Sequence, residues 1–526
     1  MRILYKIANK LFRIVKKILK LLTSRMVIIG VALLLEFCWL AGIMMQLNEK
    51  SVYINYAVTI LSLIAVLSII NNPKMNPGYK LMWAVCILAL PVTGICLYGI
   101  LGHSSVARKF RTHYDTVLLS QGGVLGEEEE TRKKLEEENI LAAGQSSYLT
   151  NYAHYPVYEN TETEYYPLGD VWFEHFIEEL KKAEHYIFME YFIISEGYLW
   201  DTVLEILKEK AVAGVDVRLI YDDFGCVTTL PYQYYKSLQQ MGIKCAAFNQ
   251  FRPVLNVILN NRDHRKIAVI DGHTAFTGGI NLADEYINRK ERFGHWKDSG
   301  ICLHGEAVWS FTVMFLQMWS TITGMECNFE SYRPEIYHEE AFKKDGFVQP
   351  YGDSPLDGET VGEHVYLNII SQAKKYLYIF TPYLIPDNET LTALCMAAKR
   401  GVDVRIVTPG IPDKKIVYIL TQANYEILLE SGVQIYQYTP GFIHSKSFVC
   451  DDEVATVGTI NMDYRSMYLH FECGVWMYGS SAVAQVKEDA LTTFEQCEQI
   501  NMDYCRKKNF AVRALRGALK FLAPLL

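Results

Sequence analysis

A pattern of fixed spacing occurs twice in this chain, and it constrains the fold more than any other feature of the sequence. Written as H-x-K-x4-D-x6-G-[GT]-x-N, it has the same spacing in both copies. Its fixed side chains are His264, Lys266, Asp271 and Asn281 in the first copy, and His444, Lys446, Asp451 and Asn461 in the second. Single matches to short motifs often arise by chance, but two copies in register with a longer repeat do not. The pattern therefore predicts two related domains in one chain.

The residues around the motif are repeated as well. Gly214–Ile220 is matched by Gly401–Val407, and each stretch is a helix-ending glycine followed by a continuous apolar strand. Amphipathic helices that alternate with such strands are typical of α/β folds with parallel strands. We therefore expect two pseudo-symmetric α/β sandwich domains with largely parallel sheets, the first over residues 147–330 and the second over residues 331–505.

Apolar residues dominate the beginning of the chain, in three segments at about 26–45, 52–71 and 81–102. Each has about 20 residues, the length that a helix needs to cross the hydrocarbon layer of a bilayer. We expect a membrane domain over residues 26–102, which makes the chain a multi-pass membrane protein. Pro91 and the glycines of the third segment permit a kink, so a full crossing and a re-entrant dip both stay open. The side of the membrane that carries the catalytic body stays open with them.

Both ends of the chain are basic, although the formal net charge of the whole chain is −8. Residues 1–25 hold eight basic side chains and residues 506–526 hold six, which leaves 37 basic against 59 acidic side chains elsewhere. We predict a basic amphipathic helix at each end that lies on anionic membrane lipid, with a solvated tail as the alternative, and a connector over residues 103–146. The acidic middle argues against nucleic acid as a partner, because contacts of Lys and Arg to phosphate dominate that affinity.

The His and Lys of each motif are two residues apart on a predicted strand, so they point to the same face. Two such pairs that meet between the domains suit a phosphodiester. Lysine ammonium groups and the amides of Asn281 and Asn461 can stabilise a pentacoordinate phosphorus. One imidazole can attack phosphorus while the other serves as acid and base. A lone histidine on such a strand is more often structural, but the duplication favours catalysis. The cysteines show no spacing typical of metal ligands, so we expect no zinc site. Lysine and asparagine groups can supply the charge stabilisation themselves, so we expect neither a metal nor a cofactor.

The two motifs resemble those of the phospholipase D superfamily, and longer strings resemble the bacterial cardiolipin synthases within it. These strings are Pro91–His103, Glu190–Ile193, Gly278–Tyr286, Thr381–Pro386, Asn461–Ser466 and Leu522–Leu526. The resemblance implies two phospholipase D-like domains and a phosphatidyltransferase of the bacterial cell membrane. It implies that two phosphatidylglycerol molecules become cardiolipin and glycerol through a phosphohistidine, without a metal. The chain departs from the family at its front end, where the common pattern has two spans.

The resemblance also implies an acidic residue that orients each histidine. Glu472 follows His444 by 28 residues and fits this role in the second half. The corresponding position in the first half is Arg292. We therefore take Asp298 as the partner of His264.

The motif leaves several assignments open. We expect Asp271 and Asp451, which close their strands at turns, to brace the site rather than transfer protons. The near symmetry of the copies does not say which histidine is the nucleophile, and the oligomeric state stays open. A phospholipase D that hydrolyses its intermediate, or a transferase that uses another alcohol acceptor, would keep every motif residue. A nuclease and a non-catalytic scaffold are less favoured, because the middle is acidic and both motifs are intact.

Overall fold

The computed structural model describes residues 30–31, 33–34, 36–38, 49–73, 75–102, 107–120, 123–126, 129–250, 261–338, 341–506 and 510–525. It divides into two compact units. The first runs from the N-terminus to Phe110, and the second comprises Arg111–Gln250 and Asn260–Leu526. The basic segment 1–25 and most of the first apolar segment lie outside the described residues, so the predictions made for them stay predictions.

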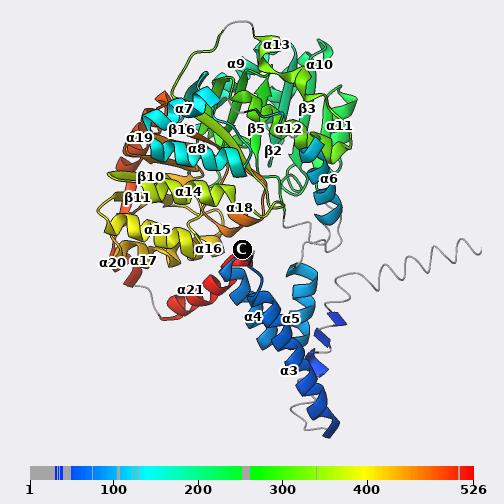
Figure 1. Cartoon of the computed structure of the whole chain (residues 1–526), viewed down its shortest axis with the longest axis vertical. Coiled ribbons are helices and arrows are strands. Elements are labelled where there is room, and N and C mark those ends of the chain that lie inside the picture. Colours follow the sequence, from blue (N-terminus) through cyan, green and yellow to red (C-terminus); the bar gives the residue numbers. More distant parts are fainter. Residues whose placement is uncertain are drawn as a thin grey trace, which may run out of the picture. The chain divides into compact units, whose positions relative to one another are not determined.

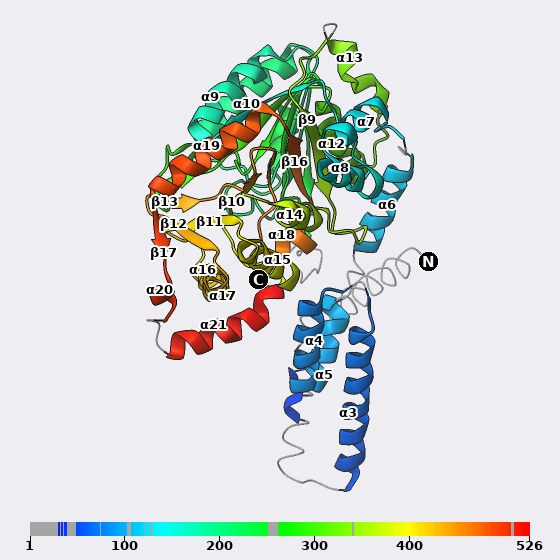
Figure 2. The ribbon, with the colours of Figure 1, turned by 60° about the vertical axis from the view of Figure 1, so that its left-hand side comes forward.

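The first unit is helical (Figure 2). Its elements are α3 (Glu49–Ile70), α4 (Pro77–Ala89), α5 (Pro91–Leu97) and a π-helical turn, η1 (Tyr98–Gly102). Among the described residues, one helix is long and apolar enough to cross a membrane: its span Val52–Ile70 has a mean hydropathy of 2.1. This helix coincides with the second of the three predicted spans.

The third apolar segment, over residues 81–102, is interrupted, as its proline and glycines permit, and is not one continuous helix. The helix breaks before Pro91, which lacks the N–H that would continue the helical hydrogen bonds. Helix α5 then lies beside α4 (Figure 2), and the approach is so close that a Cβ on Gly94 would lie 2.6 Å from the carbonyl oxygen of Cys86. The described residues therefore support one crossing helix and do not support a multi-pass arrangement.

The first half of the second unit contains a seven-stranded sheet in the order β1-β8-β6-β5-β2-β3-β4. Its strands are β1 (Thr161–Tyr166), β2 (Tyr186–Tyr191), β3 (Asp216–Asp222), β4 (Lys244–Phe248), β5 (Lys266–Ile270), β6 (Thr274–Gly278) and β8 (Gly300–Gly305). Its helices are α9 (Gly169–Lys182), α10 (Tyr198–Val212), α11 (Tyr234–Gln240), η3 (Asp284–Ile287) and α12 (Val308–Thr323). The short elements η4 (Phe329–Tyr332) and α13 (Pro334–Tyr337) lead to the second half.

The second half contains an eight-stranded sheet in the order β17-β12-β11-β10-β14-β15-β16-β9. Its strands are β9 (Phe347–Asp353), β10 (Tyr376–Phe380), β11 (Asp403–Pro409), β12 (Gln434–Tyr438), β14 (Ser447–Cys450), β15 (Val454–Gly458), β16 (Glu472–Tyr478) and β17 (Cys497–Ile500). Its helices are α14 (Val361–Gln372), α15 (Asn388–Lys399), α16 (Lys415–Ala423), α17 (Tyr425–Glu430), α18 (Tyr464–Tyr468), α19 (Ser481–Glu495), α20 (Met502–Arg506), α21 (Phe510–Leu522) and η5 (Ala523–Leu525). Figure 1 labels most of these elements in place.

The seven strands of the first sheet match seven of the second in order, and β17 is an additional edge strand. This order confirms two pseudo-symmetric α/β domains, but their sheets are mixed. Strands β2, β3 and β4 are parallel, as are β10, β11 and β12, whereas the remaining neighbours are antiparallel. The prediction of largely parallel sheets is therefore wrong. Each motif strand turns back at once into the next strand, through turns in which Asp271 and Asp451 have φ angles of 49° and 56°. Such short connections join antiparallel neighbours.

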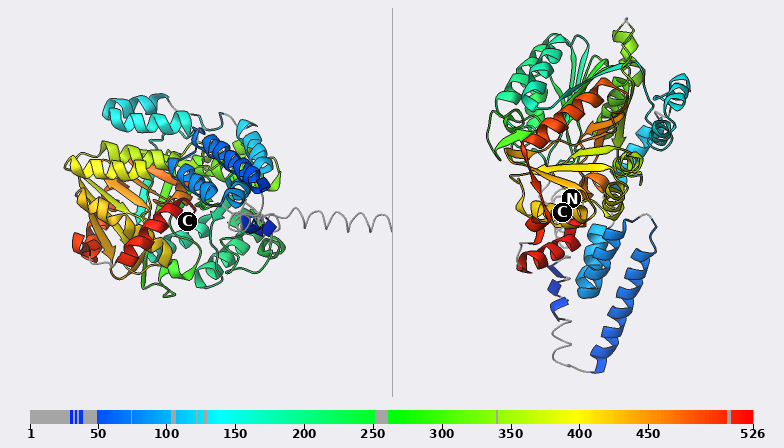
Figure 3. Two further views of the ribbon diagram at one scale, coloured as in Figure 1. Left: turned by 90° about the horizontal axis from the view of Figure 1, so that it is seen from below. Right: turned by 90° about the vertical axis from the view of Figure 1, so that its left-hand side faces the viewer.

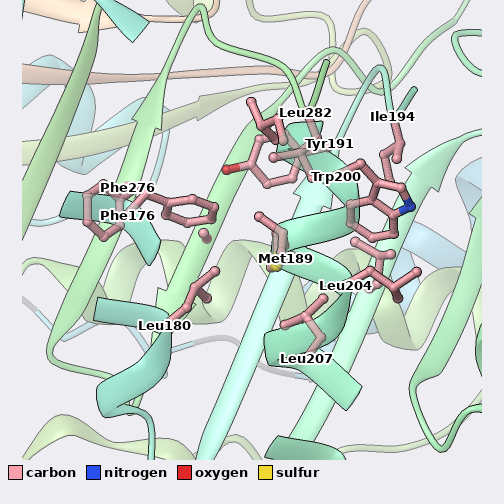
Figure 4. Close-up of a cluster of buried hydrophobic side chains, with 14 of the residues drawn as sticks. Phe176, Leu180, Met189, Tyr191, Ile194, Trp200, Leu204, Leu207, Phe276 and Leu282 are labelled. Atoms are coloured by element: carbon pink, nitrogen blue, oxygen red, sulfur yellow. The ribbon is translucent and has the colours of Figure 1, made fainter. Parts of the chain in front are cut away.

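Each half has its own hydrophobic core. In the first half the core includes Phe176, Met189, Trp200 and Phe276 (Figure 4). The core of the second half also takes buried side chains from the predicted connector, namely Leu135, Ala142, Ala143 and Leu149. These residues belong to α7 (Glu129–Glu138) and α8 (Ile140–Tyr152), which follow α6 (Ala107–Ser120). Helix α8 lies against α14 (Figures 1 and 3), so this part of the connector belongs to the second half.

Candidate active site

Each motif histidine lies just ahead of the strand that begins at or next to its lysine. Lys266 is the first residue of β5, and Lys446 directly precedes β14. All four side chains are buried: His264 and His444 are 7% exposed, and the two lysines are 1% exposed. In a buried site of low dielectric constant, charges interact far more strongly than they do in water.

Two short strand pairings join the halves beside the histidines. Strand β7 (His295–Lys297) runs parallel to β13 (Gly441–Ile443), and the backbone N–H of His444 donates to the carbonyl of Lys297 at 2.7 Å. On the other side, Asp263 forms a bridge with Phe471, and the N–H of His264 donates to the carbonyl of Phe471 at 2.9 Å. The first pairing places His444 next to Asp298, which follows β7. The second places His264 next to Glu472, which follows Phe471.

The histidine–carboxylate pairs are therefore crossed between the halves. Nδ1 of His264 lies 2.9 Å from Oε2 of Glu472, and Nδ1 of His444 lies 2.6 Å from Oδ2 of Asp298. The predicted pairing of Glu472 with His444 and of Asp298 with His264 is wrong, although both acids lie in the site. The prediction treated each half as self-sufficient, and the strand pairs between the halves decide otherwise.

The strand register explains why counting residues led to Arg292. Gly278 lies opposite Gly300 in the first sheet, and Gly458 lies opposite Gly474 in the second. Two residues before the partner glycine stand Asp298 and Glu472, so these two acids are equivalent. The first half has a longer connection between its histidine and this acid. Arg292 instead forms an ion pair with Glu285 at 2.7 Å.

The carboxylates fix the tautomer of both imidazoles. An ionised carboxylate only accepts hydrogen bonds, so Nδ1 of each histidine carries the hydrogen and Nε2 keeps its lone pair. Burial lowers the pKa of His264 to about 3 and that of His444 to about 4, although the facing carboxylates oppose this change. Both imidazoles are therefore neutral in the free protein at neutral pH, which is the form that a nucleophile needs.

The two lysines carry the positive charge of the site. Burial lowers the pKa of Lys266 to about 8 and that of Lys446 to about 7, while the carboxylates of Glu472 and Asp298 oppose the change. The Nζ of Lys266 donates to the carbonyl of His264 at 2.5 Å, and Lys446 makes the same contact with His444. The charge of Lys266 also lowers the pKa of His444, so both motifs contribute to one electrostatic site.

The motif aspartates stand at the other end of the motif strands. Asp271 accepts hydrogen bonds from the backbone N–H groups of Glu184, His185 and Tyr186, each at 2.8 Å. Asp451 does the same for residues 374–376, at 2.7 to 2.9 Å. Both carboxylates thus fix the start of β2 or β10. Five residues of strand rise about 16 Å, which keeps each aspartate away from its imidazole.

The two motif asparagines differ in their surroundings. Oδ1 of Asn281 accepts from the N–H of Ile193 at 2.9 Å, and its Nδ2 donates to the hydroxyl of Tyr286 at 2.8 Å. Oδ1 of Asn461 is buried and has no hydrogen-bond partner among the described residues. Both polar atoms of the Asn281 amide are therefore engaged in bracing a loop. A phosphate contact by Asn461 would have to come from Nδ2, its only donor, and stays a prediction.

Sequence reasoning missed the residues that surround each imidazole. Around His444 the rings of Tyr286, Trp296 and Phe442 have centroids 5.5 to 5.8 Å away. The centroid of His470 lies 5.6 Å from that of His264. A signal for His470 was present, because it stands two residues before Glu472 and alternate residues of a strand share a face.

The second residue of the G-[GT] pair contacts the carboxylate in each half. The hydroxyl of Thr459 donates to Oε2 of Glu472 at 2.5 Å. At the equivalent position Gly279 provides space, since a Cβ there would lie 2.0 Å from Oδ1 of Asp298. The carboxylate of Glu472 is therefore held by a hydrogen bond, whereas that of Asp298 fits because Gly279 has no side chain.

Two groups of described residues bring three potential metal-ligand atoms within 4.8 Å of one another. They are His264 with His470 and Glu472, and Glu363 with Asp387 and Glu389. In the first group the hydrogen bond between His264 and Glu472 already accounts for the proximity. In the second, Glu363 and Asp387 share surroundings that raise the pKa of Glu363 to about 8, mainly through burial. Neither arrangement by itself indicates a metal ion.

Two pseudo-symmetric α/β halves that bring two H-x-K pairs into one buried site define a protein of the phospholipase D class. A family model described as "Cardiolipin synthase, PLD-like domain" matches residues 176–319 and 366–493. A second, "Phospholipase_D-nuclease N-terminal", matches residues 60–103. A cardiolipin synthase of Alkalihalophilus pseudofirmus is 34% identical over 472 residues, covering 89% of this chain and 92% of the relative. The chain therefore belongs to the cardiolipin synthase family.

Two further comparisons agree with this family. An uncharacterized protein of Streptococcus mutans is 43% identical over 475 residues, which are 88% of this chain and 99% of the relative. The crystal structure of a phosphatidylserine synthase from Haemophilus influenzae covers 75% of this chain and 100% of its own, with a TM-score of 0.55 at 16% identity. At that identity the likeness shows the fold alone.

Proposed function

We propose that this protein is a membrane phosphatidyltransferase that makes cardiolipin and glycerol from two phosphatidylglycerol molecules. The observation that carries the proposal is the crossed pair of histidines in one buried site, each oriented by a carboxylate from the opposite half. Two oriented imidazoles provide one nucleophile and one acid–base group, which are what a double displacement at phosphorus requires. Membership of the cardiolipin synthase family supports phospholipids as the substrates.

In the first step, Nε2 of His264 attacks the phosphorus of a phosphatidylglycerol. The N–P bond forms as the P–O bond to the glycerol headgroup breaks, and the imidazolium of His444 gives its proton to the leaving oxygen. His444 acquires this proton when the negative phosphodiester binds, because nearby negative charge favours the imidazolium. Burial raises the pKa of Asp298, but the charges of His444 and Lys446 outweigh burial and hold it below its usual value. Asp298 therefore stays ionised beside the imidazolium.

In the second step, a hydroxyl of another phosphatidylglycerol attacks the phosphohistidine. Its proton passes to His444, the new P–O bond forms and the P–N bond breaks, which frees His264. Lys266, Lys446 and Asn461 stabilise the charge on the phosphoryl oxygens in both steps. The burial of the site excludes water, which favours transfer to an alcohol over hydrolysis.

A location in the membrane follows from the substrate and from the first unit. Helix α3 is long and apolar enough to cross a bilayer, and the chain from residue 60 matches the N-terminal family model. Helix α21 adds a basic amphipathic segment, but part of it packs on the body: Leu519 lies against the cluster of Ile385 and Leu420. Arg516 donates to Oε1 of Gln422 at 2.8 Å, so this cation is not available to lipid.

The test is an assay of the full-length protein in mixed micelles of detergent and phosphatidylglycerol labelled in the glycerol headgroup. Cardiolipin and free labelled glycerol in equal amounts are the expected products. Phosphatidic acid without cardiolipin would show that water is the acceptor, and a different diester formed after addition of phosphatidylethanolamine would identify another acceptor. His264→Ala and His444→Ala should abolish turnover, whereas His113→Ala, at an exposed position on α6, should not.

A further inference from the structure

Residues at equivalent positions of the two sheets surround the two motif histidines, but their side chains differ in chemistry. Counting back four residues from Gly474 and from Gly300, which face Gly458 and Gly278, gives His470 in the second half and Trp296 in the first. Each ring packs against the histidine of the opposite half in a tilted arrangement, with 5.6 Å between ring centroids. His444 is therefore covered by an indole, whereas His264 has a second imidazole beside it.

His470 is buried without the hydrogen bonds that a buried imidazole usually makes. Its side chain is 11% exposed, and neither Nδ1 nor Nε2 has a hydrogen-bond partner among the described residues. Nδ1 is 3.6 Å from Oε1 of Glu472, which is too long for a hydrogen bond but close enough for attraction. An unpaired buried polar group destabilises a protein, so these nitrogens are candidates for hydrogen bonds to a bound ligand.

Three ionisable side chains stand near His470. Glu472 begins β16 two residues later, His264 precedes β5, and Asp463 caps the N-terminus of α18. His470 therefore lies beside the imidazole and the carboxylate at which the proposed function places the phosphodiester.

We propose that His470 is a phosphate-contacting residue, which donates a hydrogen bond from a ring nitrogen to a free oxygen of the bound phosphodiester. This inference rests on the proposed function, because it assumes a phosphodiester at His264. It gives the two halves different roles. A hydrogen-bond donor stands beside His264, the proposed nucleophile, whereas aromatic rings enclose His444, the proposed acid and base.

Two variants distinguish the effect of the aromatic ring of His470 from the effect of its nitrogen atoms. His470→Phe keeps a ring and removes both nitrogens, and we expect the kcat for phosphatidylglycerol in mixed micelles to fall about 100-fold. His470→Asn restores an uncharged donor and should recover part of that loss. His113→Phe and His113→Asn on α6 are matched controls at an exposed histidine and should leave the rate within twofold of the wild type.

Binding of orthovanadate, a five-coordinate mimic of the transferring phosphoryl group, provides a readout that a structural role would not move. The dissociation constant of orthovanadate, measured by calorimetry, should rise in His470→Phe about as much as kcat falls, and His470→Asn should recover part of both changes. A kcat and a dissociation constant within twofold of the wild type in both variants would overturn the proposal. A fall in kcat with unchanged vanadate binding would overturn it as well.

The vanadate measurements also keep the two proposals distinguishable. Should His470→Phe fail to fold, His470→Ala removes the same two nitrogens and decides the role of His470. Should the wild-type protein make no cardiolipin but bind vanadate with an affinity that depends on His470, the proposed function is wrong and the role of His470 stands.

Discussion

At the scale of single residues, each imidazole depends on a carboxylate that arrives from the other half of the chain. His264 is paired with Glu472, and His444 with Asp298, at 2.9 and 2.6 Å. In other enzymes the removal of such a carboxylate leaves the imidazole in the wrong tautomer, at a cost in rate that reaches about 10,000-fold. The crossing therefore makes a sharp prediction about which histidine each acid controls.

We expect Glu472→Gln to slow the modification of His264 by diethyl pyrocarbonate and to leave that of His444 unchanged. Asp298→Asn should have the reverse effect, because each amide removes the negative partner of one ring only. The modification rate of each histidine can be followed by peptide mass spectrometry, and the two variants serve as controls for one another. Slower modification of His444 in Glu472→Gln would contradict the crossed pairing.

The buried lysines predict the alkaline side of the pH profile. The ammonium form stabilises the phosphoryl oxygens, so activity is complete below the lysine pKa values and is lost above them. Because these values are about 7 for Lys446 and about 8 for Lys266, kcat/KM should fall as the pH rises through this range. Lys446→Arg, whose guanidinium keeps its charge, should remove the first part of this fall, although its maximal rate will be lower. An alkaline limb that is the same in both proteins would contradict the assignment.

At the scale of elements, the pair of β7 and β13 holds His444 against Asp298. Gly441 permits this pairing, since a Cβ on it would lie 2.3 Å from the carbonyl oxygen of His295. Gly441→Ala should separate the two strands and displace Asp298 from His444. Displacements of about 1 Å in a catalytic group can cost about 100-fold in rate, and we expect a fall in kcat of that order.

Gly517→Ala is the control for this substitution, because a Cβ on that residue of α21 meets no atom within 4 Å. The reactivity of His264 should not change in Gly441→Ala, since the separate bridge of Asp263 with Phe471 holds it. Equal losses of reactivity at both histidines would indicate general unfolding instead.

Most elements around the site could be predicted from the sequence, and the misses have physical causes. The repeat predicted two α/β halves, and the spacing of His and Lys predicted that both face the site, although His264, His444 and Lys446 lie ahead of the motif strands. Strand direction was misjudged because periodicity shows burial and not direction, whereas the turns at Asp271 and Asp451 decide the direction. The pairing of Glu472 was misjudged because contacts between the halves leave no local pattern in either one.

At the scale of the whole molecule, the catalytic body has cores of its own. The core residues of both halves all follow Arg111. A chain that begins at Ala107 should therefore fold and keep a kcat within a few-fold of the full-length value in mixed micelles. Flotation with anionic vesicles should show weaker binding, because the chain lacks α3. Aggregation of this chain, or loss of its activity in micelles, would show that the first unit is needed for more than anchoring.

The crossed carboxylates also bear on how such a chain can arise. A protein with a single copy of the repeat could complete this site only as two subunits about a two-fold axis, each lending its acid to the other. Fusion of the two copies keeps that geometry while removing the requirement that they be identical. The contrasts of Asp298 with Glu472, of Gly279 with Thr459, and of Trp296 with His470 are differences that an identical pair could not have acquired.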